Sequence, residues 1–323
     1  MKRDRFVVCA ALVLVGTMFL NTQGAAQILK IGEMNTRQIR ALDLAKTVVL
    51  IPGDILEEHG PYLPSFTDGY SDEAYTQELA KAIVARPGWT VVVFPQIPLG
   101  SQPMNRAGNK ATFPGSYPVR MATLRAIYMD LATELGEQGF RWIFLVQNHG
   151  APNHHKALTQ ASDYFHDVYG GTMVDLFGLN RPSTAAEARR ELLSAKQLAE
   201  DGYSLHAGAE EQSVILFLKP ELVPESYKSA PSLTGTNFAE LVEIAKREGW
   251  PGYFGAPRLA TAALGAQEFK RSSDSLNAIA LQILDGLDPS KISRWADKEG
   301  AELKYDEAIE KRESEWLKKN KIE

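Results

Sequence analysis

Short apolar runs alternate with helical segments along the first half of this chain, and this alternation restricts its fold more than any other feature. Strand-like runs occupy residues 47–52, 90–94, 141–146 and 172–176. The helical segments between them, some with apolar residues at helical spacing, occupy residues 70–86, 121–135 and 153–169. Such alternation is typical of βαβ units. The pattern predicts an α/β protein, a three-layer α/β/α sandwich whose mainly parallel sheet is covered on both faces.

The second half of the chain carries weaker signals. Helices are expected over residues 181–200 and 237–247, with a loop over 220–236 between them. Ser273 and Asp274 are expected to cap a further helix. Residues 297–323 are dense in charge and helical in character, and two interpretations stay open: a solvated surface helix, or a helix that packs against another subunit. We expect residues 27–323 to form a single domain with this charged C-terminal helix.

The first residues predict export. Three basic residues among the first five precede an apolar stretch of about 15 residues, and Gly24-Ala25-Ala26 offers a small-residue cleavage site. This is the pattern of a signal peptide over residues 1–26, which predicts a secreted or periplasmic protein cleaved near Ala26. An uncleaved membrane anchor is the alternative, but the stretch is short for a span of roughly 20 residues.

Composition removes several classes of function. The only cysteine, Cys9, lies inside the predicted signal peptide, so thiol catalysis, disulfide bridges and thiolate ligands are not expected. The net charge is −5 and the basic residues are scattered, which predicts no nucleic-acid partner. No later apolar run is long enough to cross a bilayer, so we expect no membrane contact after signal cleavage. No Gly-x-Ser-x-Gly elbow of a serine hydrolase occurs either.

The loop after the first strand-like run carries residue types that bind metals. Glu57, His59 and Asp68 supply two carboxylates and an imidazole, a set suited to zinc or manganese. A glycine and two prolines between them stiffen the loop. In open parallel sheets, ligands bind at the carboxyl ends of the strands, where this loop begins. From these residues alone, a loop ion pair between Glu57 and His59, with Asp68 as a helix cap, is the alternative interpretation.

Two further segments carry chemically active side chains. His149 follows the strand-like run at 141–146, and His206 and Glu211 precede the apolar run at 214–218. In a parallel sheet the loop after the first run and the turn at His149 leave the same edge and can meet. The alternatives are a half-buried His149 bonded to backbone, a helix-start His206, and a Glu211 that is favoured by the helix dipole.

Together these pieces resemble the creatininase family of metal-dependent amidohydrolases. The first motif of that family, Glu-x-His-Gly-x-x-Leu-Pro-x-x-Thr-Asp, is matched at the same spacing by residues 57–68. His149 after a strand and the His-Ala-Gly segment at 206–208 fall in register with its other motifs. Residues 113–116 (Phe-Pro-Gly-Ser) are similar to its Phe-Pro-Gly-Thr turn. The likeness covers roughly residues 30–290 and implies a creatininase-like fold.

The resemblance also implies a site for two divalent metal ions, zinc or manganese, with iron as a third option. The residues that match the family's metal ligands are Glu57, His59, Asp68 and His149, with Asp68 as the bridging carboxylate. His206 matches a histidine suited to proton transfer, and Glu211 is a second catalytic candidate that could also complete a metal shell. Two ions about 3.5–4 Å apart can hold a bridging hydroxide and polarise a carbonyl oxygen. A nearby histidine can then protonate a leaving nitrogen.

The sequence departs from the family pattern at several positions. Tyr62 stands where many relatives carry a histidine, and Ala151 replaces a carboxylate found two residues after the strand-end histidine. These changes keep the metal ligands and put creatinine itself in doubt as the substrate. Glu58 and Asp72 are interpreted as surface acids rather than as partners of the metal ligands. The histidines on the helix after His149 (His154, His155 and His166) are interpreted as packed or exposed, with His154 or His155 at the mouth of the site as the alternative.

The function that the resemblance implies is an exported amidohydrolase that cleaves a C–N bond of a small linear or cyclic amide. Its partners would be a small amide or lactam substrate and further copies of the chain in a homo-oligomer, since relatives commonly form hexamers. The alternative is a non-catalytic periplasmic protein that binds a metal or a small ligand on the same fold. A screen of amides, lactams and formamides with the metal-loaded protein separates the two.

Overall fold

A parallel sheet forms the centre of the molecule. The computed structural model describes residues 27–180, 185–297 and 303–322. Within these ranges one sheet has five strands in the order β1-β3-β2-β4-β5, and every neighbouring pair is parallel. The strands are β1 (Gln27–Lys30), β2 (Thr47–Pro52), β3 (Thr90–Val93), β4 (Trp142–Val146) and β5 (Thr172–Asp175). The four strands expected from the sequence match β2 to β5 to within one residue at each end.

Strand β1 is the strand that the sequence does not reveal. It lies at the edge of the sheet and pairs with β3, with Gln27 opposite Thr90. Its side chains are mostly exposed, and Ile28 is 46% exposed. An edge strand without a buried face lacks the apolar pattern from which strands are recognised. Backbone pairing with β3 therefore defines β1.

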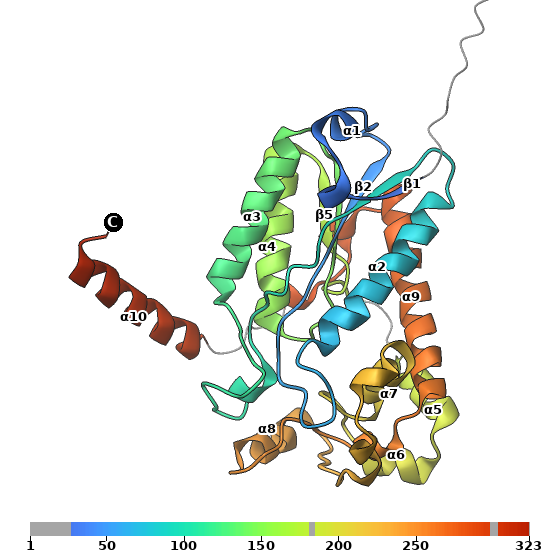
Figure 1. The fold of residues 1–323 in the computed structure, drawn as a ribbon, viewed down its shortest axis with the longest axis vertical. Coiled ribbons are helices and arrows are strands. Elements are labelled where there is room, and N and C mark those ends of the chain that lie inside the picture. Colours follow the sequence, from blue (N-terminus) through green and yellow to red (C-terminus); the bar gives the residue numbers. More distant parts are fainter. Residues whose placement is uncertain (1–26, 181–184, 298–302, 323) are drawn as a thin grey trace, which may run out of the picture.

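Two pairs of helices cover the two faces of the sheet (Figure 1). Helices α3 (Met121–Glu137) and α4 (Pro152–Tyr169) pack on one face, and α2 (Thr67–Val84) and α9 (Ala262–Leu284) pack on the other. Successive side chains of a strand point to opposite faces. Accordingly, Val49 and Ile51 of β2 contact the first pair, while Val48 and Leu50 contact the second. The predicted three-layer α/β/α sandwich is confirmed.

The other helices lie mainly around the carboxyl ends of the strands. Figure 1 shows α5, α6, α7 and α8 at that end, whereas α1 lies at the opposite end and α10 projects as an arm. Their bounds are α1 (Thr36–Arg40), α5 (Ala185–Leu192), α6 (Ala195–Asp201), α7 (Ala209–Leu218), α8 (Phe238–Lys246) and α10 (Lys304–Asn320). Short 3-10 helices span Ile31–Glu33, Met104–Arg106, Pro220–Leu222, Glu225–Ser229, Pro257–Leu259, Pro289–Lys291 and Trp295–Asp297. In the described part of the chain, no helix is long and apolar enough to cross a membrane.

The helix expected over residues 181–200 is two helices. Residues 181–184 lie outside the described part, as does the predicted signal peptide over residues 1–26. Helix α5 ends at Leu192 and α6 begins at Ala195. The break has a local cause, because Ser194 forms a capping box with Gln197, in which each side chain bonds the backbone N–H of the other residue.

The expected helix start at Ser273 is also wrong. Helix α9 begins at Ala262, where Thr261 is the N-cap and accepts a hydrogen bond from the backbone N–H of Leu264. Ser273 lies in the middle of this helix and is buried. A serine within a helix resembles a cap in sequence, and only the packing of the preceding turns against α2 and α7 shows that the helix has already begun.

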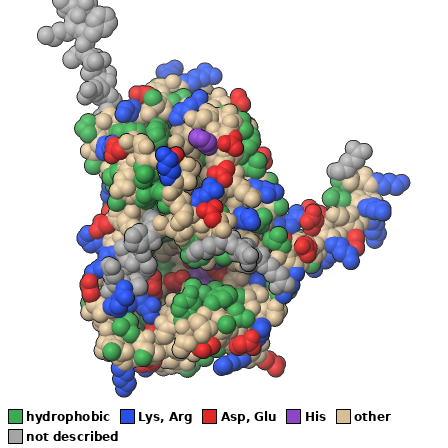
Figure 2. Space-filling view, turned by 180° about the vertical axis from the view of Figure 1, so that it is seen from behind, with side chains coloured by type: hydrophobic (Ala, Val, Ile, Leu, Met, Phe, Trp, Pro, Cys, Tyr) green, Lys and Arg blue, Asp and Glu red, His purple; other side chains and the backbone are tan. Residues whose placement is uncertain are grey.

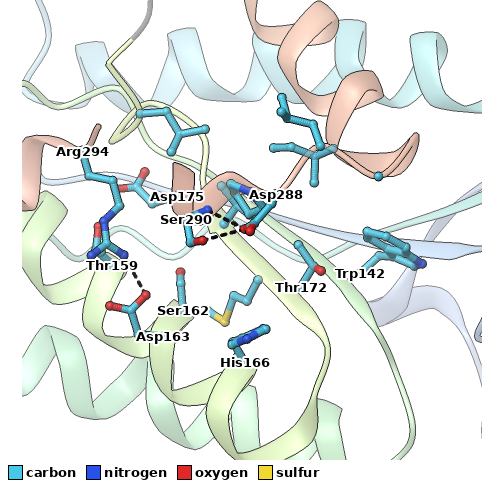
Figure 3. Close-up of a pocket in the computed structure, with 17 residues that line it drawn as sticks. Trp142, Thr159, Ser162, Asp163, His166, Thr172, Asp175, Asp288, Ser290 and Arg294 are labelled. Carbon is cyan, nitrogen blue, oxygen red and sulfur yellow. Dashed lines mark hydrogen bonds and ion pairs between the residues drawn. The ribbon is translucent and has the colours of Figure 1, made fainter. Parts of the chain in front are cut away.

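A cleft of about 340 Å³ lies beside the edge strand β5, between α4 and the segment after α9 (Figure 3). Within it Asp163 and Arg294 form an ion pair at 2.7 Å. Asp288 accepts hydrogen bonds from the hydroxyl and the backbone N–H of Ser290. None of the residues predicted for the metal site lines this cleft.

The close contact between α7 and α9 predicts that a methyl group added at Gly265 destabilises the fold. A Cβ atom at Gly265 of α9 would lie 1.9 Å from the carbonyl oxygen of Ser213 in α7. Alanine favours a helix over glycine by about 1 kcal/mol, but overpacking costs about 1–3 kcal/mol. We therefore expect Gly265→Ala to lower the free energy of unfolding in urea titrations. Gln282 on the same helix is exposed, and Gln282→Ala should change the free energy of unfolding by less than about 0.5 kcal/mol. A Gly265→Ala protein that is more stable than the parent would contradict this packing.

Candidate metal centre

The loop after β2 turns back on itself before α2 begins. The backbone N–H of Glu57 donates to the carbonyl of Ser65 at 2.9 Å and closes the loop. Gly60 adopts a φ of +67°, a conformation in which a side chain would be strained. This closure brings Asp68, in the first turn of α2, beside Glu57 and His59. The loop leaves the carboxyl end of a central strand, as expected for a ligand site in a parallel sheet.

Asp68 lies between two histidines. Its Oδ1 is 3.4 Å from Nε2 of His59, and its Oδ2 is 3.4 Å from Nδ1 of His149. The N-cap of α2 is Phe66, and no side chain caps this helix end. The alternative interpretation of Asp68 as a helix cap is therefore wrong. The buried carboxylate instead joins the loop after β2 to the turn after β4.

Two sets of potential ligands share Asp68. In the first, Glu57 Oε2 lies 3.0 Å from His149 Nδ1. In the second, Glu211 Oε2 lies 3.7 Å from His59 Nε2. Within each set, one ligand atom from each of three residues lies within 4.8 Å of the other two. The structure thus brings together all five of these sequence-predicted residues, from three separate parts of the chain.

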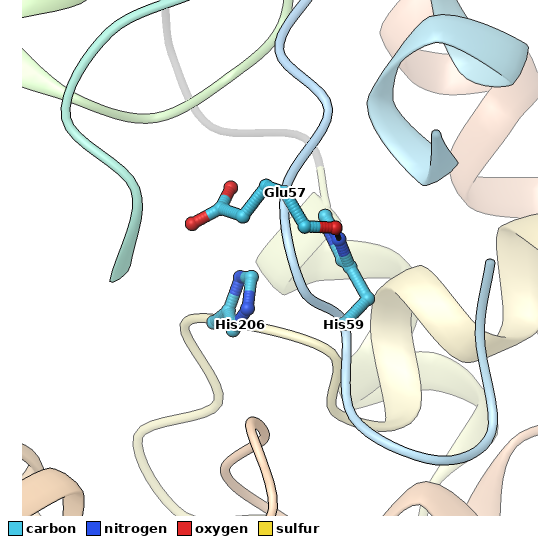
Figure 4. A group of neighbouring side chains, drawn as sticks. All are labelled: Glu57, His59 and His206. Carbon is cyan, nitrogen blue, oxygen red and sulfur yellow. Dashed lines mark hydrogen bonds between the residues drawn. The ribbon is translucent and has the colours of Figure 1, made fainter. Parts of the chain in front are cut away.

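His206 completes the cluster from the segment before α7 (Figure 4). Its ring centroid is 4.4 Å from that of His59, and the two histidines with Glu57 form a third group of potential ligands. Nε2 of His206 lies 2.6 Å from the backbone carbonyl of Glu58. Since a carbonyl can only accept, this nitrogen carries the proton in that hydrogen bond. Nδ1 is then the nitrogen that remains available as an acceptor.

Backbone carbonyls orient the two histidines beside Asp68. Nδ1 of His59 donates to the backbone carbonyl of Glu57, two residues earlier, at 3.2 Å, which leaves Nε2 facing Asp68. Nε2 of His149 donates to the carbonyl of Gln102 at 3.2 Å, which leaves Nδ1 facing the carboxylates. Metal-binding histidines commonly donate their outer N–H in this way, because the bond sets the tautomer and the ring orientation.

Unpartnered buried atoms show that the cluster fits a metal. Glu57 Oε2, His59 Nε2 and Asp68 Oδ2 are buried without a hydrogen-bond partner. Leaving such an atom unsatisfied costs about 1–3 kcal/mol, yet these three atoms lie on the sides where the residues face one another. Carboxylate oxygens and imidazole nitrogens are the donor set of zinc and manganese sites. The residues present therefore fit divalent metal ions.

The metal-free cluster balances its charges with protons. Burial alone would lower the pKa of His59, but the carboxylates around it, Asp68 first, raise it to about 10. The pKa of His149 is likewise well above its usual value, because Glu57 and Asp68 outweigh burial. Burial would raise the pKa of Asp68, but both histidines hold it below its usual range. Positive charge is thus favoured at the place where a cation would bind.

Two buried acids, Asp54 and Asp72, bind the backbone of the turn that carries His149. Asp54 and Asp72 are 0% exposed. Asp54 accepts the backbone N–H of His149 at 2.8 Å, and Asp72 accepts that of Asn148 at 3.1 Å. Burial raises the pKa of Asp54 to about 7 and the pKa of Asp72 well above its usual value. These two acids hold the turn that carries His149.

The interpretation of Glu58 and Asp72 as surface acids is wrong. Two residues that contribute to the site, Asp54 and Gln102, were not predicted from the sequence. Glu58 is 2% exposed and accepts a hydrogen bond from the Ser116 hydroxyl, and Asp72 is buried as described above. Asp54 was missed, although its place two residues after the end of β2 was a usable signal. Gln102 was missed too, and it has a φ of +64°. Ala207 beside His206 has a φ of +52°, and such strained residues cluster at functional sites.

The other histidines lie outside these ligand sets. His154 is 0% exposed and its Nε2 is 3.6 Å from Asp54, while His155 bonds Asp175 at 2.7 Å. Both are packed, as one of the sequence interpretations held. His166, near the end of α4, is exposed. In the described residues, no group of potential ligands includes any of the three.

A polar cavity of about 190 Å³ reaches the cluster. Asp68 and Glu211 line it together with Tyr75 and Asn148. Figure 2 shows a hollow in the surface midway along one face, with acidic and histidine side chains visible inside it. Burial raises the pKa of Glu211, which lines the cavity, to about 7. The cluster therefore combines a metal-type donor set with groups that hold or release protons near neutral pH.

Comparisons with known proteins agree with this geometry. The family model Creatininase (creatinine amidohydrolase) matches residues 32–280. A mycofactocin precursor peptide peptidase from Mycobacterium ulcerans (strain Agy99) is 27% identical over 286 residues, which cover 85% of this chain and 96% of that protein. The sequence resemblance to this family is thereby confirmed.

Solved structures show the same fold. A creatinine amidohydrolase (creatininase) superposes with a TM-score of 0.60 at 19% identity, over 79% of this chain and 98% of that one. A structure described as creatininase Mn gives 0.59 at 17% identity, with the same shares covered. A putative creatinine amidohydrolase from Bacteroides fragilis NCTC 9343 gives 0.56 at 21%, over 79% and 96%. With a family match over most of its length, a shared fold and a cluster of metal-type ligands, the chain belongs to the creatininase family of hydrolases.

Proposed function

We propose that this protein is an exported, metal-dependent amidohydrolase that cleaves a C–N bond of a small linear or cyclic amide. One observation carries the proposal: Asp68 lies between two histidines whose outer nitrogens are held by backbone carbonyls, so that their inner nitrogens face carboxylate oxygens. The relative from M. ulcerans is named as a peptidase and the solved relatives as creatinine amidohydrolases. Both names describe hydrolysis of C–N bonds.

The proposed ligands form two sets that share Asp68. Glu57 and His149 complete one set, and His59 and Glu211 complete the other. We assign Glu211 to metal binding rather than proton transfer because its Oε2 lies 3.7 Å from His59 Nε2. When bound, divalent ions lower the pKa of a coordinated water and polarise a carbonyl oxygen. Zinc and manganese are the proposed metals, supported by relatives described as creatininase Mn and as a Zn-Zn type creatininase.

His206 is the proposed proton carrier. Burial lowers its pKa to about 4, so the ring is neutral at pH 7. Its Nε2 proton is engaged by the carbonyl of Glu58, and Nδ1 is therefore the atom that accepts a proton from the attacking water. The same proton passes to the amide nitrogen as the C–N bond breaks, and the products are a carboxylic acid and an amine.

Export and assembly remain proposals as well. The basic start, the apolar stretch and the small residues before Gln27 support a secreted or periplasmic location. Membership of the family supports a homo-oligomer.

Removal of the metal tests the reaction. We expect a chelator to abolish amide hydrolysis and zinc or manganese to restore it. Asp68→Asn is nearly isosteric, but it should lower both metal content and turnover by about 100-fold or more, because one carboxylate serves both sets. Metal analysis by mass spectrometry and a screen of amides, lactams and formamides measure the two effects.

A matched control and a second outcome sharpen that test. Asp163 is an exposed acid of the distant cleft, and Asp163→Asn should leave metal content and turnover unchanged. Full turnover in Asp68→Asn or His59→Ala would refute the metal mechanism. If the protein bound metal with high affinity and hydrolysed no compound of the screen, it would instead be a non-catalytic metal-binding protein.

Proton release tests the ligand set independently of activity. His59 has a pKa of about 10 in the metal-free protein, so at neutral pH it is protonated and a metal must displace that proton. The association constant should therefore rise with pH by about tenfold per unit for each displaced proton, and level off above the pKa. Calorimetry in buffers of different ionisation enthalpy counts the protons. His166→Ala should release the same number, whereas an absence of release between pH 6 and 8 would contradict a protonated His59 in the cluster.

The N-terminal pattern predicts a defined mature protein. When the full chain is expressed in a bacterium with a periplasm, we expect the protein in the periplasmic fraction to begin at Gln27. Intact-mass analysis of that fraction measures the cleavage site. A cytoplasmic or membrane-bound product that retains Met1 would contradict export with cleavage.

A further inference from the structure

A second cavity, of about 250 Å³, adjoins the proposed metal centre. Gln102 and Met104 line it, and both also contact proposed ligands: the Gln102 carbonyl accepts from His149, and the Met104 backbone N–H donates to Glu57. Leu205, the residue before His206, lines another part of its wall. These shared residues place the cavity beside the cluster, next to Glu57 and His149.

The walls of this cavity are largely apolar. Phe238 and Val242 of α8 line it together with Tyr305 of α10. The cationic Arg106 is neutralised within the wall, because its Nη1 lies 2.9 Å from Asp306 Oδ1 and both side chains are mostly buried. A small cavity with apolar and aromatic walls and no unbalanced charge favours an uncharged apolar group.

Part of the wall comes from outside the family-matched residues 32–280. Tyr305 and Asp306 belong to the first turn of α10, the helix that projects from the body in Figure 1. Asp306 Oδ2 accepts the backbone N–H of Met121 at 2.8 Å, and Lys304 Nζ donates to Asn109 at 2.8 Å. These bonds hold the first turn of α10 against the rim. The wall is thus a feature of this chain's own C-terminal segment.

We propose that this cavity binds an apolar group of the amide substrate, preferably an aromatic one, and that the first turn of α10 forms its outer limit. The proposal rests on the proposed function, since it places the reacting amide at the metal centre. It narrows the substrate class to amides that carry an uncharged apolar or aromatic substituent within reach of the carbonyl. Polar amides as small as formamide would leave the cavity unused.

Two hydroxamates of different size test the cavity separately from the metal centre. Acetohydroxamate chelates a divalent ion and has no tail, whereas 3-phenylpropionohydroxamate adds a phenyl group on a short arm. Calorimetry on the zinc-loaded protein should show about 10–100-fold tighter binding of the phenyl probe, the gain expected when a phenyl side chain is buried. Val242→Trp fills the cavity and should bring the ratio of the two affinities close to one.

Controls on the same two helices separate the cavity from general effects. Glu243→Trp adds the same bulk on the exposed side of α8 and should leave the ratio of the two hydroxamate affinities as in the parent protein. Tyr305→Ala removes part of the α10 wall and should lower this affinity ratio by up to about tenfold. Glu310 is exposed, and Glu310→Ala should not change the ratio. Phe238→Ala, at a side chain that is 48% exposed, gives a second wall variant if Val242→Trp fails to fold.

The outcomes distinguish this inference from the proposed function. If neither hydroxamate bound the zinc-loaded protein, both proposals would be overturned. If acetohydroxamate bound and the phenyl group added no affinity, the metal centre would stand and the cavity would be rejected. A preference for the phenyl probe that survived both Val242→Trp and Phe238→Ala would place the tail elsewhere and would also reject the cavity.

Discussion

The carboxylate of Asp68 is the contact on which the rest of the site depends, because each of its oxygens faces a different histidine. The histidines cannot turn away, since the outer nitrogen of His59 is bonded to the Glu57 carbonyl and that of His149 to the Gln102 carbonyl. The loop after β2, the first turn of α2 and the turn after β4 are thereby tied together. Such preorganisation is valuable for a metal site, because ligands that are already oriented pay little entropy when an ion binds.

Burial gives this arrangement its electrostatic character. Carboxylates and imidazoles lie together with little contact with water, and isolated charges in such a place would be very costly. The carboxylates raise the pKa of His59 and His149, and the histidines lower the pKa of Asp68, so positive charge is favoured where a cation fits. Further out, Asp54 and Asp72 have raised pKa values, and they act through hydrogen bonds to the backbone of the His149 turn. A cation bound by this cluster would therefore displace protons from the histidines.

The family-matched core and the C-terminal helix α10 contribute different parts of the region around the cluster. The shared fold supplies the strand ends at which the cluster forms. Within this chain, Glu211 joins His59 and Asp68 in one group of potential ligands, and α10 adds Tyr305 and Asp306 to a neighbouring cavity. The residues of this wall are separate from the cluster, so a substitution in the wall changes the cavity without removing a potential metal ligand.

The sequence by itself determined the layers of the fold and identified most of the residues that meet in the cluster. Strand and helix periodicity are local properties, so β2 to β5 and the long helices could be predicted, and the motif within residues 57–68 named three members of the cluster. The break at Ser194 was equally local and could have been read from its capping box. Only the tertiary structure decided that Asp54 lies beneath His149 and that the wall of the second cavity includes Tyr305. Those contacts join residues far apart in sequence, and they arise from the packing of whole elements, which no local pattern encodes.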